Sequence, residues 1–279
     1  MASGRGAAYR VRVHPYFAVA TPHLFAHRGA SGHAPENTLV AFERAWATGV
    51  PYLEMDCHAT CDGEVVIAHD PLLERTTDGE GPIRQVPYAR LRELDAGYRF
   101  SPDGGRSTPF RGQGVRMPRL VEVLETFPQA RVNLEIKQAE PAIAAEVVRI
   151  VRRARAQDRV LLAAEDDTLL DTIRALDAGT ALGSSLADCT AFFRALDAGS
   201  IAAHEPRGQA LQIPAAVLGR ALVTPESVAA AGRLGLHIHV WTINDPAEMR
   251  SLLALGAHGL MSDYPERLQA AARERAAAR

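Results

Sequence analysis

Charged and imidazole side chains occur at the ends of three short apolar runs in this sequence. They form three pairs, namely His27 with Arg28, Glu54 with Asp56, and Glu135 with Lys137. If the runs are β-strands, residues two apart share a face, so both members of the second pair point the same way, as do those of the third. Such a group of carboxylates, cations and an imidazole can bind a metal ion together with an anionic substrate.

The three carboxylates need a positive partner. Two unit charges about 4 Å apart repel by about 4 kcal/mol at an effective dielectric of about 20. Arg28 and Lys137 supply part of the positive charge, but an all-oxygen set also suits a hard divalent cation. We therefore predict that Mg²⁺ or Ca²⁺ is bound by Glu54, Asp56 and Glu135. No cluster of thiolates or histidines in the sequence predicts a structural zinc site.

A hairpin is expected to bring a second histidine to this group. In "DCHATCDGEVVIAHD", Asp62-Gly63 is typical of a two-residue turn between two strands. Counting back along both arms then sets His69 directly opposite Asp56, on the same face. With His27, it forms a pair in which one imidazole accepts a proton from a nucleophile and the other protonates a leaving oxygen. Cations beside such a pair stabilise a phosphoryl transition state, so we predict phosphodiester cleavage.

The elements that position these residues alternate regularly along the chain. Past residue 130, short β-branched runs alternate with amphipathic stretches in six strand–helix units, from "RVNLEIK" to "GLMSD" and its helix. Two more units precede them, "LFAHRG" with "TLVAFERAWATG" and "PYLEMD" with "RLVEVLETF". Eight units predict a (β/α)₈ TIM barrel, whose active site lies at the carboxyl ends of the strands. An open doubly wound sheet is the alternative, but no glycine-rich phosphate fingerprint supports it.

The expected domain organisation follows from these units. Residues 1–23 form an N-terminal extension, and residues 24–279 form one barrel domain. Residues 57–118 are an insertion between the second strand and its helix, and an insertion of that size in a barrel is usually functional.

The composition favours small-molecule chemistry. The chain has 279 residues and a formal net charge of −2, which gives no indication of nucleic-acid binding. No apolar run approaches the length of a membrane-spanning helix, and no segment resembles a signal peptide. Three cysteines form no disulfide framework, and Cys57 lies too far along one strand from Cys61 to pair with it. A cytoplasmic location is therefore expected, with export left open.

Taken together, several segments resemble the glycerophosphodiester phosphodiesterase family. They are "AHRG" with "PENT", then "LEMD", "DGEVVIAHDPLLERTTDG", "NLEIK", "VWTIND" and "GLMSDYPE", in order between about residues 24 and 268. The resemblance implies a (β/α)₈ barrel that hydrolyses glycerophosphodiesters to glycerol 3-phosphate and an alcohol, with two histidines and a divalent metal. It also implies that a glycerol hydroxyl attacks phosphorus, giving a cyclic phosphate that water then opens.

The resemblance assigns the same residues to the site and adds one. His27 and His69 are the acid/base pair, Arg28 and Lys137 hold the phosphate, and the metal ligands are Glu54, Asp56 and Glu135. Trp241 lines the substrate side, a role that depends mainly on the resemblance.

Smaller predictions concern the neighbours of the site. Glu36 and Asn37 are expected near the mouth, where they support the metal ligands. Either Asn37 or Thr38 caps the first helix. His58 is expected at the solvent-exposed rim, past the end of its strand, and the remaining histidines receive no role.

Three alternatives stay open. A lysophospholipase D of the same superfamily would release lysophosphatidic acid, with the arginine-rich stretch of residues 95–119 covering the site and contacting an acyl chain. A barrel without catalytic activity would serve as a binding module, although no histidine or metal carboxylate is missing. A metal-dependent sugar isomerase would not need paired histidines around a cationic phosphate site. The sequence leaves open the alcohol, the choice between Mg²⁺ and Ca²⁺, and the oligomeric state.

Overall fold

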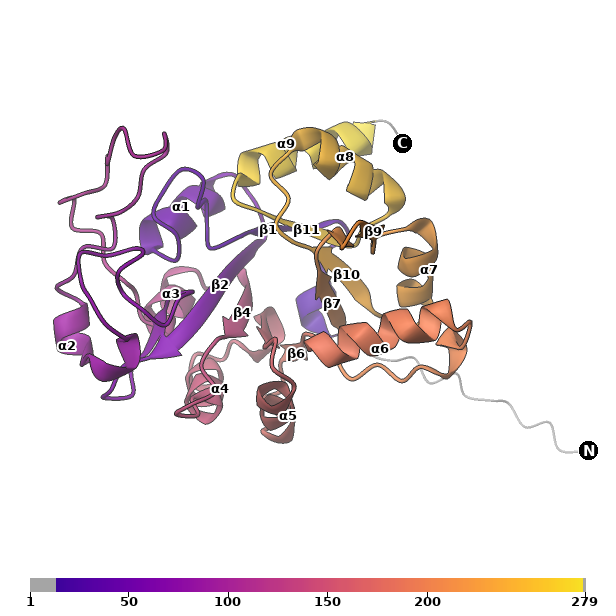
Figure 1. The fold of residues 1–279 in the computed structure, drawn as a ribbon, viewed down its shortest axis with the longest axis horizontal. Coiled ribbons are helices and arrows are strands. Elements are labelled where there is room, and N and C mark those ends of the chain that lie inside the picture. The colour runs from indigo at the N-terminus through magenta and orange to yellow at the C-terminus, as the bar shows by residue number, and fades with distance from the viewer. Residues whose placement is uncertain (1–13, 278–279) are drawn as a thin grey trace, which may run out of the picture.

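The short apolar runs form eight parallel strands in the described part of the chain, residues 14–277 of this computed structural model (Figure 1). The strands are β1 (His23–Ala26), β2 (Tyr52–Ala59), β4 (Arg131–Ile136), β5 (Val160–Ala163), β6 (Ala181–Leu182), β7 (Ala210–Ile213), β10 (His237–Val240) and β11 (Gly259–Ser262). They are adjacent in the order β6-β5-β4-β2-β1-β11-β10-β7. This order wraps the sheet around until its first and last members meet.

The two end strands join only briefly. A single parallel bridge pairs Gly183 with Ala210, just past the short β6. Ser184 donates its backbone N–H to the carbonyl of Ala210 (2.9 Å), and Gln209 donates to Leu182 (2.8 Å). The barrel is therefore nearly closed, and the predicted (β/α)₈ fold is confirmed.

Helices cover the outside of the barrel, as Figure 1 shows. The helices that follow the parallel strands are α1 (Leu39–Ala47), α3 (Leu120–Thr126), α4 (Ala144–Arg153), α5 (Asp167–Ala175), α6 (Leu186–Asp197), α7 (Pro225–Arg233), α8 (Pro246–Leu255) and α9 (Pro265–Ala277). Side-chain caps begin several of them, since Thr38, Thr224 and Asp245 each accept a hydrogen bond from a backbone N–H of the first turn. Of the two residues predicted to cap α1, Thr38 does so. No helix of the described residues has the length and apolar character needed to span a bilayer.

The alternation of side chains along β2 separates two layers of packing. Leu53 and Met55 are fully buried in the main core, between the sheet and the helices, as predicted. Tyr52 points the other way, into a second cluster inside the barrel. Glu54 and Asp56 share that inner side and line the cavity above Tyr52. The period of two therefore places apolar packing low in the barrel and carboxylates at its mouth.

The amino-terminal end of the barrel is closed by a short 3₁₀ turn, η1 (Pro15–Phe17). Tyr16 and Phe17 are buried there against the inner cluster. The carbonyl of Tyr16 accepts hydrogen bonds from the Tyr52 hydroxyl (2.9 Å) and from Arg131 Nε (3.0 Å). The described part of the predicted N-terminal extension thus packs on the barrel, while residues 1–13 lie outside the described residues.

The hairpin after β2 differs from the predicted one. β2 pairs antiparallel with β3 (Val65–Ile67) in a register that joins Cys57 to Ile67. Three residues form the turn, because Thr60 and Glu64 pair across it and Gly63 takes a left-handed φ of 85°. The predicted two-residue turn is therefore wrong, and so is the direct pairing of Asp56 with His69, which lies one position further along.

The same register extends β2 further than expected. His58 lies inside the strand and is 4% exposed, with its Nε2 3.0 Å from the carbonyl of His69. The prediction of a solvent-exposed His58 is therefore wrong. Cys57 and Cys61 are both free thiols, as predicted.

The rest of the insertion packs on its own small core beside the barrel. It contains η2 (Ile83–Gln85) and α2 (Tyr88–Leu91). The residues buried in this core are Val66, Ala68, Leu73, Ile83, Leu91 and Met117. Elsewhere the chain adds η3 (Gln157–Arg159), η4 (Ile201–Ala203) and a small hairpin of β8 (Ala216–Val217) and β9 (Arg220–Ala221).

Candidate active site

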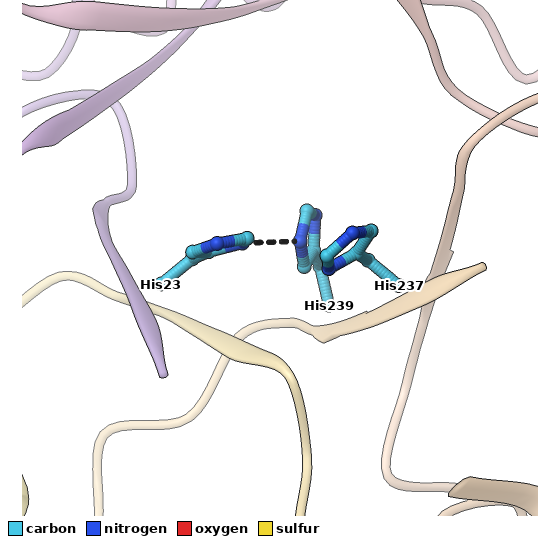
Figure 2. Close-up of side chains that lie close together, drawn as sticks. All are labelled: His23, His237 and His239. Carbon is cyan, nitrogen blue, oxygen red and sulfur yellow. Dashed lines mark hydrogen bonds between the residues drawn. The ribbon is translucent and has the colours of Figure 1, made fainter. Parts of the chain in front are cut away.

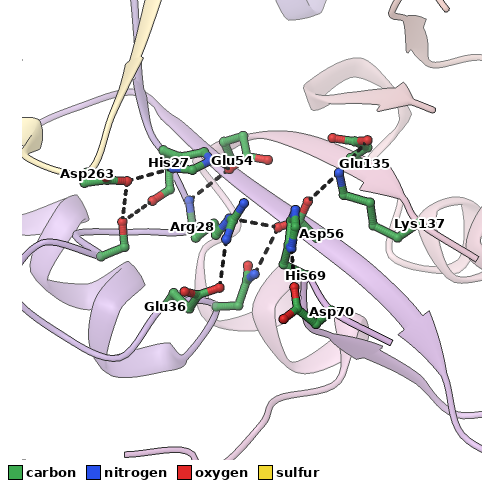
Figure 3. A network of polar contacts seen from close by, with 12 residues as sticks. His27, Arg28, Glu36, Glu54, Asp56, His69, Asp70, Glu135, Lys137 and Asp263 are labelled. Carbon is green, nitrogen blue, oxygen red and sulfur yellow. Dashed lines mark hydrogen bonds and ion pairs between the residues drawn. The ribbon is translucent and has the colours of Figure 1, made fainter. Parts of the chain in front are cut away.

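The carboxyl ends of the strands surround a cavity of about 460 Å³. Active sites of (β/α)₈ barrels lie at this end. All eight residues predicted to contact substrate or metal line the cavity, namely His27, Arg28, Glu54, Asp56, His69, Glu135, Lys137 and Trp241. Glu36 and Asn37, the predicted supporting residues, contact members of this set. Figure 3 shows how the polar groups meet from separate parts of the chain.

The three carboxylates come from two neighbouring strands. Glu54 and Asp56 project from β2, and Glu135 is the register partner of Asp56 on β4. One oxygen of each lies within 4.8 Å of the other two, and Asp56 is 2% exposed. Burial and the charge of Asp56 raise the pKa of Glu54, and burial raises the pKa of Glu135. A divalent cation would reverse both effects by favouring the ionised forms, so this donor set fits a hard metal ion.

Two cations contact the carboxylates. Lys137 Nζ lies 2.7 Å from Glu135 Oε1 and 3.6 Å from Asp56 Oδ1. Arg28 Nε lies 3.4 Å from the other Asp56 oxygen, and Arg28 Nη1 donates to Glu36 (3.0 Å). Burial disfavours the charge on Lys137, but Glu135 and Asp56 outweigh burial and raise its pKa. Both cations therefore stay charged at the edge of the cavity, where they can bind an anion.

The backbone next to these groups takes an uncommon conformation. Arg28 and Asn37 have positive φ angles of 54° and 58°. In this conformation the Arg28 N–H donates to Glu54 Oε2 (2.9 Å), and Asn37 Nδ2 donates to Asp56 Oδ2 (3.1 Å). Asn37 Oδ1 is buried and has no hydrogen-bond partner among the described residues. Positive φ at a non-glycine residue costs of order 1–3 kcal/mol and is typical of functional sites.

His27 is held by a carboxylate that sequence reasoning did not include. Its Nδ1 donates to Asp263 Oδ1 (2.7 Å), which leaves Nε2 directed toward Glu54 at 4.0 Å. Asn244 and Ser31 also donate to Asp263. Burial lowers the pKa of His27, but the bond to Asp263 and the charge of Glu54 outweigh burial and raise it. Because an ionised carboxylate only accepts, Asp263 fixes the proton on Nδ1 and frees Nε2 for chemistry.

His69 has a similar partner in the residue that follows it. Its Nδ1 donates to Asp70 Oδ1 (2.6 Å). Asp70 also accepts from Arg75, which makes two hydrogen bonds of 2.7 Å to Glu36. Burial would raise the pKa of Asp70, but the bonds from Arg75 and His69 lower it to about 2. Glu36 therefore links the His69 side of the site to Arg28.

The outer rim of the cavity is apolar on one side. Trp241 follows β10, Leu186 begins α6 and Val217 belongs to β8. All three line the cavity, and they are 43%, 63% and 46% exposed. Large apolar side chains with this exposure form a surface that an apolar group of a ligand can cover.

The arginine-rich stretch lies elsewhere. None of the cavity-lining residues falls between positions 95 and 119, although every residue in that range is described. Arg111 stacks over the ring of Tyr98 at 4.2 Å and donates to the Tyr98 carbonyl (3.0 Å). The stretch therefore does not line this cavity, although Ala96 and Met117 line a small neighbouring pocket together with Glu36, Asn37 and His69.

Comparison with known proteins identifies the family. Residues 27–267 match the model of the glycerophosphoryl diester phosphodiesterase family. A glycerophosphodiester phosphodiesterase of Bacillus altitudinis is 30% identical over 254 residues, covering 88% of this chain and 95% of that protein. The mouse lysophospholipase D GDPD1 is 25% identical over 269 residues, covering 88% of this chain and 84% of that protein.

A solved structure supports the same family assignment through its fold. The phosphodiesterase of Oleispira antarctica, in complex with its product sn-glycerol-3-phosphate, superposes with a TM-score of 0.73 at 30% identity. The match covers 90% of this chain and 97% of that one. Together with the barrel and its carboxylate-lined cavity, these matches show that the chain belongs to the glycerophosphoryl diester phosphodiesterase family.

Proposed function

We propose that this protein hydrolyses glycerophosphodiesters to sn-glycerol 3-phosphate and an alcohol. The observation that carries the proposal is the pair of histidines in one cavity, each with Nδ1 bound to a carboxylate, beside three clustered carboxylates. The barrel of residues 24–279 is the unit that carries this activity, and residues 1–23 are an extension of it. An inactive binding module has no need for two oriented imidazoles.

His27 and His69 act as the acid/base pair. With Nδ1 occupied by Asp263 or Asp70, each ring presents Nε2, which accepts a proton when neutral and donates one when charged. In the first step, one histidine removes the proton of a glycerol hydroxyl, whose oxygen bonds to phosphorus while the bond to the alcohol breaks. The other histidine protonates the departing alcohol oxygen. In the second step the roles reverse, and water opens the cyclic phosphate to glycerol 3-phosphate.

The carboxylates Glu54, Asp56 and Glu135 would hold the divalent metal, with Mg²⁺ and Ca²⁺ as the candidates for an all-oxygen set. When bound, such an ion supplies Lewis-acid stabilisation of charge on phosphoryl oxygens. Arg28 and Lys137 provide fixed positive charge for the same phosphate. Asn37 positions Asp56 through its amide, and Glu36 positions Arg28.

The apolar rim supports a second candidate, a lysophospholipase D. Trp241 lines the substrate side, and with Leu186 and Val217 it offers an exposed apolar surface next to the phosphate-binding groups. The acyl chain of a lysophospholipid has the chemistry to cover this surface, whereas the arginine-rich stretch does not reach it. Both activities would use the same histidines and carboxylates, and this chain is similar to proteins named for each activity.

One experiment separates the two activities. Purified protein is incubated with glycerophosphocholine or lysophosphatidylcholine, each with Mg²⁺, with Ca²⁺ and with a chelator. Metal-dependent release of glycerol 3-phosphate supports the first function and names the ion, and release of lysophosphatidic acid alone supports the second. Turnover that persists in chelator would contradict the metal assignment, and no turnover of either substrate under all three conditions would overturn the proposed function. The cytoplasmic location stays a prediction.

A further inference from the structure

A second group of chemically capable side chains lies at the opposite end of the barrel. His23 is the first residue of β1, and His237 and His239 lie on β10 (Figure 2). One nitrogen from each ring lies within 4.8 Å of the other two. None of the three lines the cavity described above. No histidine cluster in the sequence predicted a zinc site, because these residues meet only through the barrel.

The sheet register explains why the rings meet. His23 and His239 are both register partners of Gly259, the first residue of the strand between them. A Cβ at Gly259 would lie 2.9 Å from the ring of His239 and 2.8 Å from the carbonyl of His23. The glycine therefore leaves room for two imidazoles to approach over it. His237, two residues before His239, shares their side of the sheet.

The hydrogen bonds direct a lone pair into the group. His23 Nε2 lies 3.1 Å from the carbonyl of Val19, so this nitrogen carries the proton, and Nδ1 of the neutral ring is the acceptor. In this structure that Nδ1 accepts a hydrogen bond from His239 Nε2 (3.2 Å, Figure 2), so His239 has to release this proton before both nitrogens can bind one ion. Two imidazole nitrogens bound to one tetrahedral zinc ion at about 2.0 Å each lie roughly 3.3 Å apart. A backbone carbonyl on the far nitrogen is also the usual way in which a metal-binding histidine is oriented.

The group is not satisfied as an ordinary aromatic core. Phe17 stacks on His237 with ring centroids 4.2 Å apart, and Phe25 and Tyr52 pack nearby, which accounts for the rings as filling. However, Nδ1 of His237 and Nδ1 of His239 are buried without a hydrogen-bond partner among the described residues. His239 is fully buried. Leaving a polar atom unpaired in a core costs about 1–3 kcal/mol. An ion bound by Nδ1 of His237 would remove that cost at His237, whereas His239 faces His23 with Nε2 and would keep its own Nδ1 unpaired.

We propose that His23, His237 and His239 form a binding site for a transition metal ion of the Zn²⁺ type, separate from the carboxylate site. Three imidazoles suit Zn²⁺, Co²⁺ or Ni²⁺, whereas the oxygen set at the other end suits Mg²⁺ or Ca²⁺. An ion there links β1 to β10 across β11 and lies beneath the turn η1. Its role is structural, since active sites of this fold lie at the opposite end.

The test measures metal content directly and does not depend on the hydrolase activity. The metal-stripped full chain is equilibrated with Zn²⁺ in excess Mg²⁺, separated from free metal by gel filtration, and analysed for zinc. His237→Phe removes one donor but keeps a ring that can stack on Phe17. His258→Asn is the matched control, because His258 lies beside His237 but outside the group, and an asparagine oxygen can still accept the Ile238 N–H that His258 Nδ1 accepts. Asp56→Asn reports on the carboxylate site.

We expect His237→Phe to lower the zinc content by about one ion per chain, both alone and combined with Asp56→Asn. His258→Asn should retain the ion. The unmutated chain should also give the intense visible absorption of tetrahedral Co²⁺, a measurement that needs no variant to fold. Equal zinc content in the folded His237→Phe variant and the unmutated chain, or no zinc and no such Co²⁺ absorption in the unmutated chain, would overturn the proposal.

Discussion

Histidine side chains occupy both ends of the barrel, but their neighbours differ. At the carboxyl end, the bond to Asp263 and the charge of Glu54 outweigh burial and raise the pKa of His27. At the amino end, burial lowers the pKa of His23 to about 4 and that of His237 to about 3, and neighbouring histidines add to the effect. The same side chain is therefore prepared for proton transfer at one end and kept neutral at the other.

A carboxylate on Nδ1 distinguishes the two uses of histidine. His27 and His69 each have one, which fixes the proton on Nδ1 and leaves Nε2 free. His237 and His239 have none in the described structure, where their Nδ1 atoms are unpaired. A neutral imidazole without a carboxylate is a poor acid but a good ligand for a soft or borderline metal.

The largest expected effect comes from removing a ring at one end or the other. His27→Ala and His69→Ala should each lower kcat/KM for glycerophosphocholine by about 10²–10⁴-fold, since each removes a general acid or base. His237→Phe should leave that value within about twofold, because it lies far from the cavity. The measurement is glycerol 3-phosphate release by purified protein whose fold is checked by circular dichroism. Near-normal activity in either alanine variant would contradict the acid/base assignment.

Removing only the carboxylate partner should have a smaller effect. Asp263→Asn should lower kcat/KM by about 10–100-fold, as is usual for partners that orient a functional imidazole. Because Asp263 helps to raise the pKa of His27, its loss lowers that pKa, and the limb of the pH profile that reports His27 moves to lower pH. The dependence of kcat/KM on pH is measured between about pH 5 and about pH 9 for the unmutated protein and for Asp263→Asn. An unmoved profile would show that Asp263 does not act through His27.

The two ends should also lose stability in different pH ranges. In the metal-free chain, the unfolded state protonates its histidines below about pH 6.5, whereas His23 and His237 stay neutral in the fold down to about 4 and about 3. Stability is therefore complete above about pH 6.5 and falls as the pH drops, by about 1.4 kcal/mol per pH unit for each extra proton bound by the unfolded chain.

The carboxyl end follows a different window. Asp70 and Asp263 have a pKa of about 2 in the fold, so their contribution persists above the ordinary carboxyl value of about 3.9 and is lost only below it. Urea unfolding with chelator at several pH values measures both windows. In His237→Phe, the free energy of unfolding should fall less steeply as the pH drops below about 6.5, while its pH dependence below about 3.9 stays the same. An unchanged pH dependence below about 6.5 would contradict this account of the amino end.

The smallest expected effect concerns the rim. Leu186→Ser with Val217→Ser should raise KM for lysophosphatidylcholine by about fivefold, because part of the apolar area that an acyl chain covers is lost. The same variant should bind glycerophosphocholine as before, since its choline is too short to use that surface. Arg111→Ala is the control in the arginine-rich stretch and should change neither KM. If the control weakened lysolipid binding and the rim variant did not, the acyl chain would have to lie over the insertion.

The sequence predicted most of the fold and the functional groups at the mouth. Period-two alternation identified Glu54 and Asp56 as inward residues, because strand geometry fixes which side each residue faces. Hairpin geometry was predicted less well. The turn has three residues, with a positive φ at Gly63, where two were predicted. The extra residue shifts the pairing of β2 with β3 by one position.

The partners of the histidines were harder to predict. Asp70 directly follows His69, and Asp263 directly follows the last strand. Their positions next to a histidine and at a strand end could have identified them, but strand periodicity alone does not select such residues. The amino-end group carried none. His23 is more than two hundred residues from His239, and only the register through Gly259 brings them together.

The brief junction of β6 with β7 has a consequence for motion. Because a single bridge joins β6 to β7, we expect the barrel to open locally between these two strands first. Among the strand amides, hydrogen exchange should therefore be fastest around Gly183 and Ala210. Ser184, Ser185 and Leu186, on that side, line the cavity, whereas the carboxylates project from β2 and β4 on another part of the wall. Local opening between β6 and β7 would widen the entrance of the cavity for bulky leaving alcohols, while the carboxylates on β2 and β4 keep their spacing.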